Sequence, residues 1–355
     1  MVLVMTNTGC LSGSANGEGK GNVSHFKPFS EFLDRYIFDQ ELSQYVRVEW
    51  LLWDRTPFAR IVSIFDRATG ENLCAKVIYK RFCSPTGLLV LDPQVLTSIR
   101  HKNIIKYYDI YESEEEIIVT IERYECRHHV FSCRAFGGEL LERIIEKIHY
   151  TEMDASHIIK QVLEAVAYLH SKNIVGLASL PENILLPIAG NDTYIKLSDF
   201  GLSKLIRNDD HSLGNCRPRT FSMVGSDYYT APEVFRHKGY DYKADVFGVG
   251  IVTFTLLCGY NPYCGPSGAC FRKEGLLLED PYWTHISPAA KDFVTWLLQT
   301  DPEKRPSAEE CLKHHWITVG MREECEKQAP EDVVIDVNQP FRDHMTQSRR
   351  LSSYA

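Results

Sequence analysis

The sequence is short of positive charge. Its 39 lysines and arginines stand against 47 aspartates and glutamates, which gives a formal net charge of −8 at pH 7. A nucleic-acid binder usually carries a basic face, so we expect no nucleic-acid partner. Long apolar runs are missing too, and none approaches the roughly 20 residues that cross a bilayer. We therefore expect no membrane partner.

A disulfide framework is not indicated either. The eleven cysteines are scattered and odd in number, which is typical of reduced thiols inside a cell. The expected location is the cytoplasm. Cysteines and histidines gather at residues 126–133, but their spacing matches no structural zinc pattern. We predict a surface loop without metal for the insert at residues 125–136.

The sequence does contain enough apolar material for a large core. With 355 residues, 44% of them hydrophobic, one two-lobed domain with tails is the simplest organisation. Residues 1–27 and most of 319–355 are predicted to be disordered, because they lack apolar periodicity. Apolar residues recur at helical spacing in 28–44, which predicts a short helix with Ser30 as a candidate N-cap.

From Tyr45 onward the pattern becomes strand-like. Alternating apolar residues predict strands at 46–48, 59–65 and 73–79, and Thr69-Gly70 predicts the turn between the last two. Further along, Asn183 and Asp199 fall at the ends of two β-rich runs. Hard divalent cations prefer oxygen ligands, so this pair is a candidate metal site on a triphosphate.

Several motifs together resemble the protein kinases. Asp199-Phe200-Gly201 matches their metal-binding loop, and segments between 138 and 318 are similar in sequence to the calcium/calmodulin-dependent kinase group. The resemblance covers roughly residues 45–318 and implies an α+β bilobal protein kinase fold. Residues 45–125 would form an N-lobe with a small antiparallel β-sheet and one main helix. Residues 126–318 would form a larger, mainly helical C-lobe.

The resemblance also assigns a nucleotide site and a buried frame. Lys76 aligns with the lysine that pairs with phosphates, and Asp92 aligns with the helix carboxylate that pairs with this lysine. Because Pro93 follows Asp92, a solvated aspartate at the start of a helix is an equally good assignment. Asp245 is expected to support the loop at 176–183. The implied base pocket consists of Ile61, Cys74, Ile121 and Leu185, the implied metal ligands are Asn183 and Asp199, and the implied buried ion pair is Glu233 with Arg305.

The same alignment indicates what the chain has lost. The catalytic His-Arg-Asp positions are Gly176, Leu177 and Ala178, and Leu180 stands where relatives have a lysine near the γ-phosphate. The family glycines that cradle phosphates align with Asp54, Thr56 and Ala59, and no glycine occurs between Tyr45 and Gly70. Glycine there lets the backbone approach the phosphates closely.

Two functions follow from this balance of losses and retained residues. Loss of a catalytic base typically slows transfer by about 10²- to 10⁴-fold, which favours a pseudokinase that acts as a scaffold or allosteric regulator. Retention of Lys76, Asn183 and Asp199 favours the alternative, a serine/threonine kinase with residual or unconventional metal–ATP phosphotransfer. In both, weak binding of ATP with Mg²⁺ or Mn²⁺ is possible, and the fold is expected to require no cofactor. A third option is a signalling module that binds no nucleotide at all, which the state of the cleft would decide.

Protein partners are expected, such as other kinases or signalling proteins. Relatives often carry a calmodulin-binding helix after the domain, but 319–355 has few cations and few apolar anchors, so calmodulin is only the weaker alternative to a disordered tail. Thr220 follows Arg217 by three residues, and Ser352 follows Arg349-Arg350. Both are candidate phosphosites for a basophilic kinase.

Overall fold

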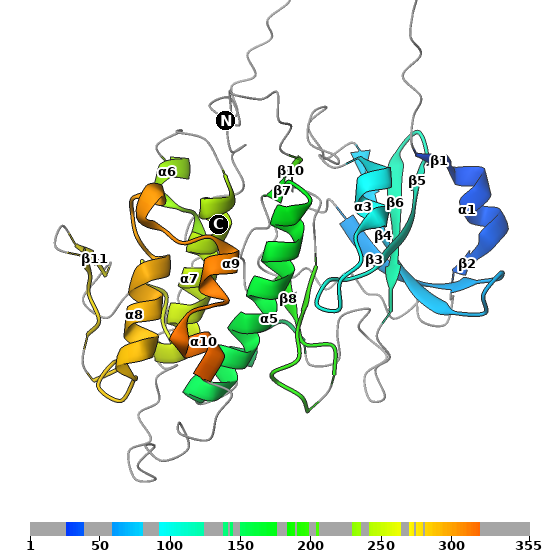
Figure 1. Ribbon diagram of the computed structural model, residues 1–355. Helices are drawn as coiled ribbons and strands as arrows, with labels where there is room; N and C mark the ends of the chain where they lie inside the picture. The colour runs from blue at the N-terminus through cyan, green and yellow to red at the C-terminus, as the bar shows by residue number, and fades with distance from the viewer. Residues whose placement is uncertain are drawn as a thin grey trace, which may run out of the picture.

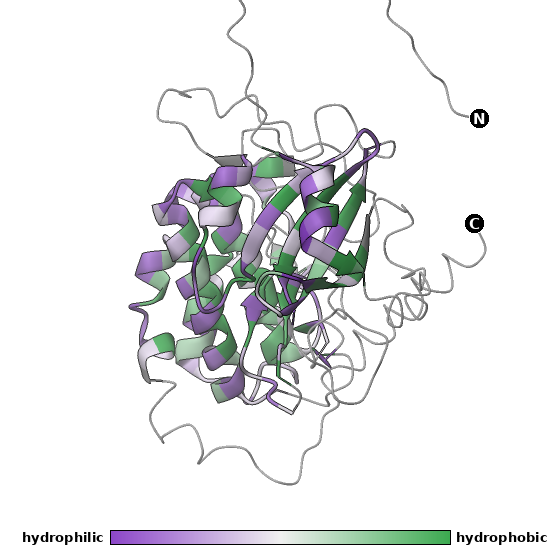
Figure 2. Ribbon diagram, turned by 90° about the vertical axis from the view of Figure 1, so that its right-hand side faces the viewer, coloured by the Kyte–Doolittle hydropathy of each residue, from purple (hydrophilic) through white to green (hydrophobic). Residues whose placement is uncertain are grey.

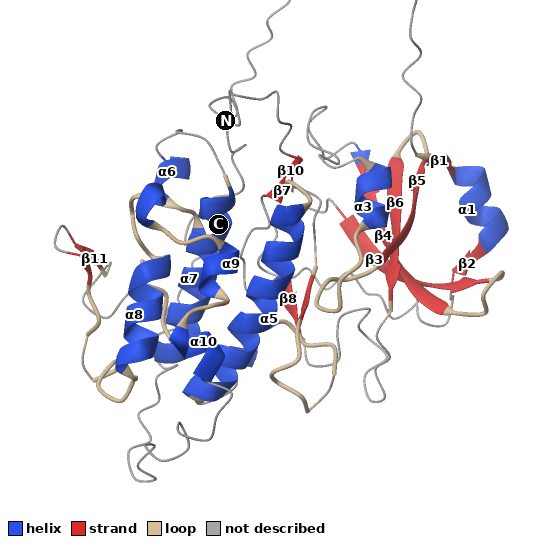
Figure 3. Ribbon diagram, in the orientation of Figure 1, coloured by secondary structure: helices blue, strands red, loops and turns tan. Residues whose placement is uncertain are grey.

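A computed structural model gives the architecture of the chain. It describes residues 26–38, 59–80, 92–123, 138–140, 143–144, 150–175, 183–188, 190–198, 204–205, 229–235, 241–263, 270–272, 275–279 and 281–319. Strands form an N-terminal lobe and helices dominate a C-terminal lobe (Figure 3). The predicted α+β bilobal fold is therefore confirmed.

The N-lobe is built on a six-stranded sheet in the order β1-β5-β6-β4-β3-β2. Neighbouring strands are antiparallel, except that β1 runs parallel to β5. The predicted turn between β3 and β4 is present, with Gly70 at a φ of 73° that glycine adopts without strain. The strands are β1 (Lys27–Pro28), β2 (Tyr36–Phe38), β3 (Ala59–Asp66), β4 (Asn72–Tyr79), β5 (Tyr107–Glu112) and β6 (Glu116–Glu122).

The helix expected at 28–44 is shorter than predicted. Helix α1 spans Phe29–Arg35, and the backbone becomes extended at Tyr36, where β2 begins. The predicted Ser30 N-cap is wrong, because Pro28 occupies the N-cap position without a side-chain hydrogen bond. The apolar residues of this segment thus belong first to a helix and then to a strand.

The N-lobe begins earlier than residue 45, because Lys27 already pairs with Tyr111 in the sheet. This also corrects the boundary of the N-terminal tail. Helix α1 lies across the face of the sheet opposite α3 (Pro93–Ser98), as Figures 1 and 2 show. The cluster beneath it consists of Phe32, Tyr36, Val62, Ile64, Leu73, Ala75, Val77, Tyr111 and Ile118. The strand expected at 46–48 lies outside the described residues.

Arg35 ties α1 to two strands of the sheet. Its Nη2 lies 2.8 Å from Asp66 Oδ2, and its Nη1 lies 2.8 Å from Asp109 Oδ2. Burial alone would raise the pKa of Asp66, but the Arg35 guanidinium and the Ala68 N–H outweigh this and lower it. Asp66 is therefore held as a carboxylate at neutral pH, and the helix is fixed by charge as well as by packing.

The C-lobe is organised around α5 (Glu152–Ser171) and α7 (Tyr242–Cys258), which contact each other. Helix α5 begins with a capping box, in which Thr151 Oγ1 accepts from Asp154 N at 3.0 Å. Helix α7 is buried on every side from Ala244 to Cys258, which makes it the centre of the lobe. The remaining helices are α6 (Pro232–Phe235), α8 (Pro288–Leu297), the 3-10 turn η5 (Pro302–Lys304), α9 (Ala308–Cys311) and α10 (His315–Val319).

Three two-stranded sheets lie in the described part of the C-lobe. Each pairs two-residue strands in antiparallel fashion. They are β7 (Ile174–Val175) with β10 (Lys204–Leu205), β8 (Ile184–Leu185) with β9 (Lys196–Leu197), and β11 (Phe271–Arg272) with β12 (Gly275–Leu276). Within the described part of the chain, none of the helices has the length and apolar character that a membrane span requires.

Candidate nucleotide site

One face of the sheet collects the residues expected to bind a nucleotide. Lys76 of β4 pairs with Ile61 of β3, and Cys74 pairs with Ile121 of β6. Paired residues of antiparallel strands point to the same face, and so do residues two apart on one strand. Cys74 is fully buried, while Lys76, Ile61 and Ile121 are partly exposed. Ile121 packs against the main core, so this face looks toward α3 and the C-lobe.

Asp92 caps the N-terminus of α3. Its Oδ1 accepts a hydrogen bond from Gln94 N at 2.7 Å, and Pro93 occupies the first helical position. The carboxylate expected to pair with Lys76 is thus an N-cap. The pair between Lys76 and Asp92 stays a prediction.

The candidate metal ligands belong to the β8–β9 hairpin. Asn183 directly precedes β8, and its carbonyl oxygen accepts from Ser198 N at 2.8 Å across the hairpin. Asp199 follows Ser198 and lies outside the described residues. The hairpin is joined to the N-lobe side by Leu197, whose N–H bonds to the Asn103 carbonyl at 2.8 Å. Leu185, expected in the base pocket, is partly buried against the main core.

Most of the altered catalytic positions are outside the described residues. These are Gly176, Leu177, Ala178 and Leu180, together with the candidate phosphosites Thr220 and Ser352. The flanking chain is described: β7 ends at Val175, and Val175 pairs with Lys204 of β10. The strand that leads into the altered loop is therefore paired with a strand that follows Asp199.

The buried ion pair expected in the C-lobe is present. Arg305 Nη1 lies 2.6 Å from Glu233 Oε1, and Nη2 lies 3.1 Å from Oε2, so the pair is bidentate. The Arg305 side chain is completely buried, and its guanidinium also donates to the carbonyls of Lys243 and Gln299. Burial, together with the nearby Glu233 carboxylate, raises the pKa of Tyr263, whose hydroxyl remains a proton donor.

Asp245 is fully buried at the start of α7. Its Oδ2 lies 2.9 Å from His170 Nε2, which anchors the last turn of α5. The loop it was expected to support, residues 176–183, is described only at Asn183. His170 was not predicted from the sequence, although its place at the end of a periodic helix puts it near the altered loop.

Comparison with known proteins identifies the family. The sequence model of the protein kinase domain matches residues 57–317. The chain belongs to the protein kinase family. It is 36% identical over 262 residues to calcium/calmodulin-dependent protein kinase cmkA of Emericella nidulans, a match covering 72% of this chain and 59% of that protein.

Other kinases match over the same region. Human calcium/calmodulin-dependent protein kinase type 1B is 35% identical over 266 residues, which covers 74% of this chain and 72% of that protein. The probable serine/threonine-protein kinase pXi of Dictyostelium discoideum is 34% identical over 260 residues, or 73% of this chain and 34% of that protein. The chain therefore spans only part of cmkA and pXi.

The phosphate cradle of the kinase family has no counterpart in the sequence. The edge strand next to β3 is β2, which spans Tyr36–Phe38. It precedes residues 46–48, where the alignment with the kinase family predicts the first strand. Moving the alignment restores no glycine, because none occurs between Gly21 and Gly70. The family match itself begins at residue 57.

Sequence reasoning missed two charged contacts where the lobes meet. Glu122 Oε1 lies 2.7 Å from Lys196 Nζ, a bond between the sheet and the β8–β9 hairpin. Arg123 Nη1 donates to Ser63 Oγ at 2.8 Å, on the same face of the sheet as Cys74. The available signal was a charged residue at the end of an otherwise apolar strand.

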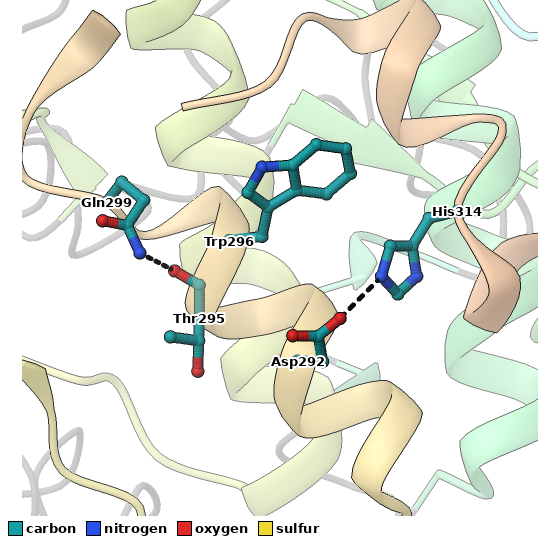
Figure 4. A pocket seen from close by; sticks show the side chains of 5 residues that line it. All are labelled: Asp292, Thr295, Trp296, Gln299 and His314. Atoms are coloured by element: carbon teal, nitrogen blue, oxygen red, sulfur yellow. Dashed lines mark hydrogen bonds and ion pairs between the residues drawn. The ribbon is translucent and has the colours of Figure 1, made fainter. Parts of the chain in front are cut away.

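A shallow pocket lies apart from this site, on α8 (Figure 4). Its volume is about 380 Å³, and it is lined by Asp292, Thr295, Trp296, Gln299 and His314. His314 Nε2 lies 3.1 Å from Asp292 Oδ2, and Gln299 Nε2 donates to the Thr295 carbonyl at 3.0 Å. Among the described residues, no cluster of histidine, cysteine or acidic side chains is suited to hold a metal ion. The insert at 125–136 lies outside them.

Proposed function

We propose that this chain binds ATP and a divalent cation between its lobes and acts in protein signalling. The observation that carries the proposal is the shared face of Lys76, Ile61 and Cys74, which looks toward the C-lobe. Lys76 would hold phosphate, the apolar side chains would hold the base, and Asn183 with Asp199 would hold the metal. The bound metal–nucleotide supplies a transferable phosphoryl group, and the protein's part is to position it.

The first candidate function is serine/threonine phosphotransfer by an unconventional route. It is favoured by the names of the relatives, which are protein kinases, and by retention of Lys76, Asn183 and Asp199. Metal-dependent incorporation of labelled phosphate that disappears in Asp199→Ala would support it. The relatives' names also suggest calmodulin as a partner, which a calcium-dependent pull-down with the full chain would test.

The second candidate function is that of a pseudokinase, which regulates partners through its fold. It is favoured by Ala178 at the position of the catalytic base and by Leu180 at the position of the phosphate-binding lysine. No acidic residue lies between Gly176 and Pro181 that would replace the base. Phosphate incorporation equal to that of a heat-inactivated sample would support this candidate.

Nucleotide binding is tested by thermal unfolding of the full chain with ATP, with and without Mg²⁺ or Mn²⁺. At about a hundred times its dissociation constant, a ligand stabilises the folded state by about 2.7 kcal/mol. We expect a metal-dependent rise in melting temperature that Lys76→Met abolishes. Lys80→Met is the matched control, because the Lys80 ammonium already binds Glu112 Oε1 at 2.6 Å. No rise in the unaltered chain would contradict the proposal.

Restoring one catalytic residue is expected to have little effect. Ala178→Asp should leave phosphate incorporation into a peptide within about threefold of the unaltered chain, because residues of one catalytic unit do not act additively. Leu180 and the missing glycines would still leave the phosphates unsupported. Ala178→Asn controls for side-chain size. A rise of about 100-fold in Ala178→Asp alone would show that only the base was missing.

A further inference from the structure

The two lobes are connected by a partly buried ion pair, Glu122 with Lys196, named here the hinge pair. Lys196 Nζ lies 2.7 Å from Glu122 Oε1, and the two side chains are only 12% and 18% exposed. The same carboxylate oxygen accepts from Lys106 N at 2.8 Å, and Glu122 N donates to the Lys106 carbonyl at 3.0 Å. The Glu122 carboxylate is therefore also held by the backbone of the N-lobe at Lys106.

Each member of the hinge pair is next to one part of the proposed nucleotide site. Glu122 directly follows Ile121, which is in register with Cys74 in the base-binding face. Lys196 pairs with Leu185 in the β8–β9 hairpin. That hairpin begins after Asn183 and leads into Asp199, the two candidate metal ligands. The pair thus joins the base-binding end of the site to its metal-binding end.

Arg123, the residue after Glu122, contacts the N-lobe sheet instead of the C-lobe hairpin. Arg123 Nη1 donates to Ser63 Oγ at 2.8 Å, and Ser63 is 1% exposed. Glu122 is therefore bound to the C-lobe hairpin, while its neighbour is bound to the N-lobe sheet. An ion pair this far from solvent is screened less by salt than an exposed one. Removing one partner leaves the other charge poorly compensated.

We propose that Glu122 and Lys196 are positioning residues that set the metal-binding hairpin relative to the base pocket. The proposal rests on the proposed nucleotide binding for its functional consequence, but the mechanical coupling is a property of the protein alone. The coupling can therefore be measured without any ligand.

The first test is amide hydrogen exchange of the full chain without nucleotide. In Glu122→Gln and Lys196→Met, the amides of Leu197 and Ser198 should exchange about tenfold faster, because the hairpin loses its side-chain contact with the sheet and keeps only its backbone hydrogen bonds near Asn103. The double variant should resemble either single one, since both remove the same contact. Lys102→Met is the matched control, because the Lys102–Glu164 pair is equally short, at 2.8 Å, but its lysine is 65% exposed.

The proposal is overturned if exchange rises only within β6, or no more than in the Lys102→Met control. It is also overturned if the two single effects add in the double variant. The Glu122→Gln substitution keeps a side-chain oxygen for the Lys106 N–H, so the local hydrogen bond within the N-lobe is retained. A general loss of the fold would be recognised by faster exchange throughout β4 and β5.

The second test compares adenosine with Mg–ATP by calorimetry. Glu122→Gln should leave adenosine affinity nearly unchanged and reduce the metal-dependent gain in ATP affinity about tenfold. Equal losses for both ligands, or an unchanged metal-dependent gain, would overturn the positioning role. If the unaltered chain binds neither ligand, the proposed nucleotide function fails, and the exchange experiment still decides the coupling.

Discussion

Arg305→Met is expected to lower the free energy of unfolding by about 3 to 5 kcal/mol. The guanidinium makes a bidentate contact with Glu233 and is completely buried. Its removal leaves a buried carboxylate without its counter-charge and takes one donor away from the carbonyls of Lys243 and Gln299. Chemical denaturation of the full chain, followed by tryptophan fluorescence, measures the change.

The adjacent exposed residue supplies the control for this experiment. Lys304→Met changes the same type of charge one position earlier and should shift stability by less than about 0.5 kcal/mol. Replacing Glu233 and Arg305 together by methionine should recover part of the loss, because no isolated charge remains buried. A loss below about 1 kcal/mol for Arg305→Met would contradict the buried-pair interpretation.

The second large effect concerns α1. Phe32→Ala is expected to cost about 3 to 5 kcal/mol, because Phe32 is fully buried at the centre of the cluster between α1 and the sheet. Its ring lies 5.3 Å from the Tyr111 ring in an edge-on arrangement. The free energy of unfolding is measured by denaturant titration.

The neighbouring residue again gives a matched comparison. Leu33 is 47% exposed, so Leu33→Ala should change stability by less than about 1 kcal/mol. Equal effects of the two substitutions would mean that α1 does not pack on the sheet through Phe32. A fragment that starts at residue 45 would lack α1 and its contacts with the sheet.

Two features of the C-lobe could be predicted, one from a local signal and one from the family resemblance. Thr151 and Asp154 have the spacing of a capping box, and the resemblance implied the ion pair of Glu233 with Arg305. The N-terminal boundary was missed because its signal is neither local nor part of the resemblance. The apolar residues of 28–44 have helical spacing, but Tyr36 is held by a strand pairing with Asp66, far along the chain. Periodicity within one segment carries no information about such a partner.

The candidate site, too, could be predicted only in part from the sequence. The family resemblance assigned Lys76, Ile61 and Ile121 to one nucleotide site, and the strand register puts them on one face of the sheet. The Asp92 carboxylate accepts from Gln94 N at the start of α3, as its alternative assignment to a helix start implied, and its pairing with Lys76 stays a prediction. The bond between Glu122 and Lys196 depends on how two lobes meet, which neither residue indicates alone.

The sheet order also has a consequence for synthesis. Both outer strands, β1 and β2, come from the single segment Lys27–Phe38, which crosses the sheet through α1. Its partner at one edge is Tyr111, and β6 lies between β5 and β4. The sheet therefore cannot be completed until the chain has been synthesised through Glu122. Until then, Phe32 and Tyr36 can pack on β3 and β4 but lack Tyr111 and Ile118 of their cluster.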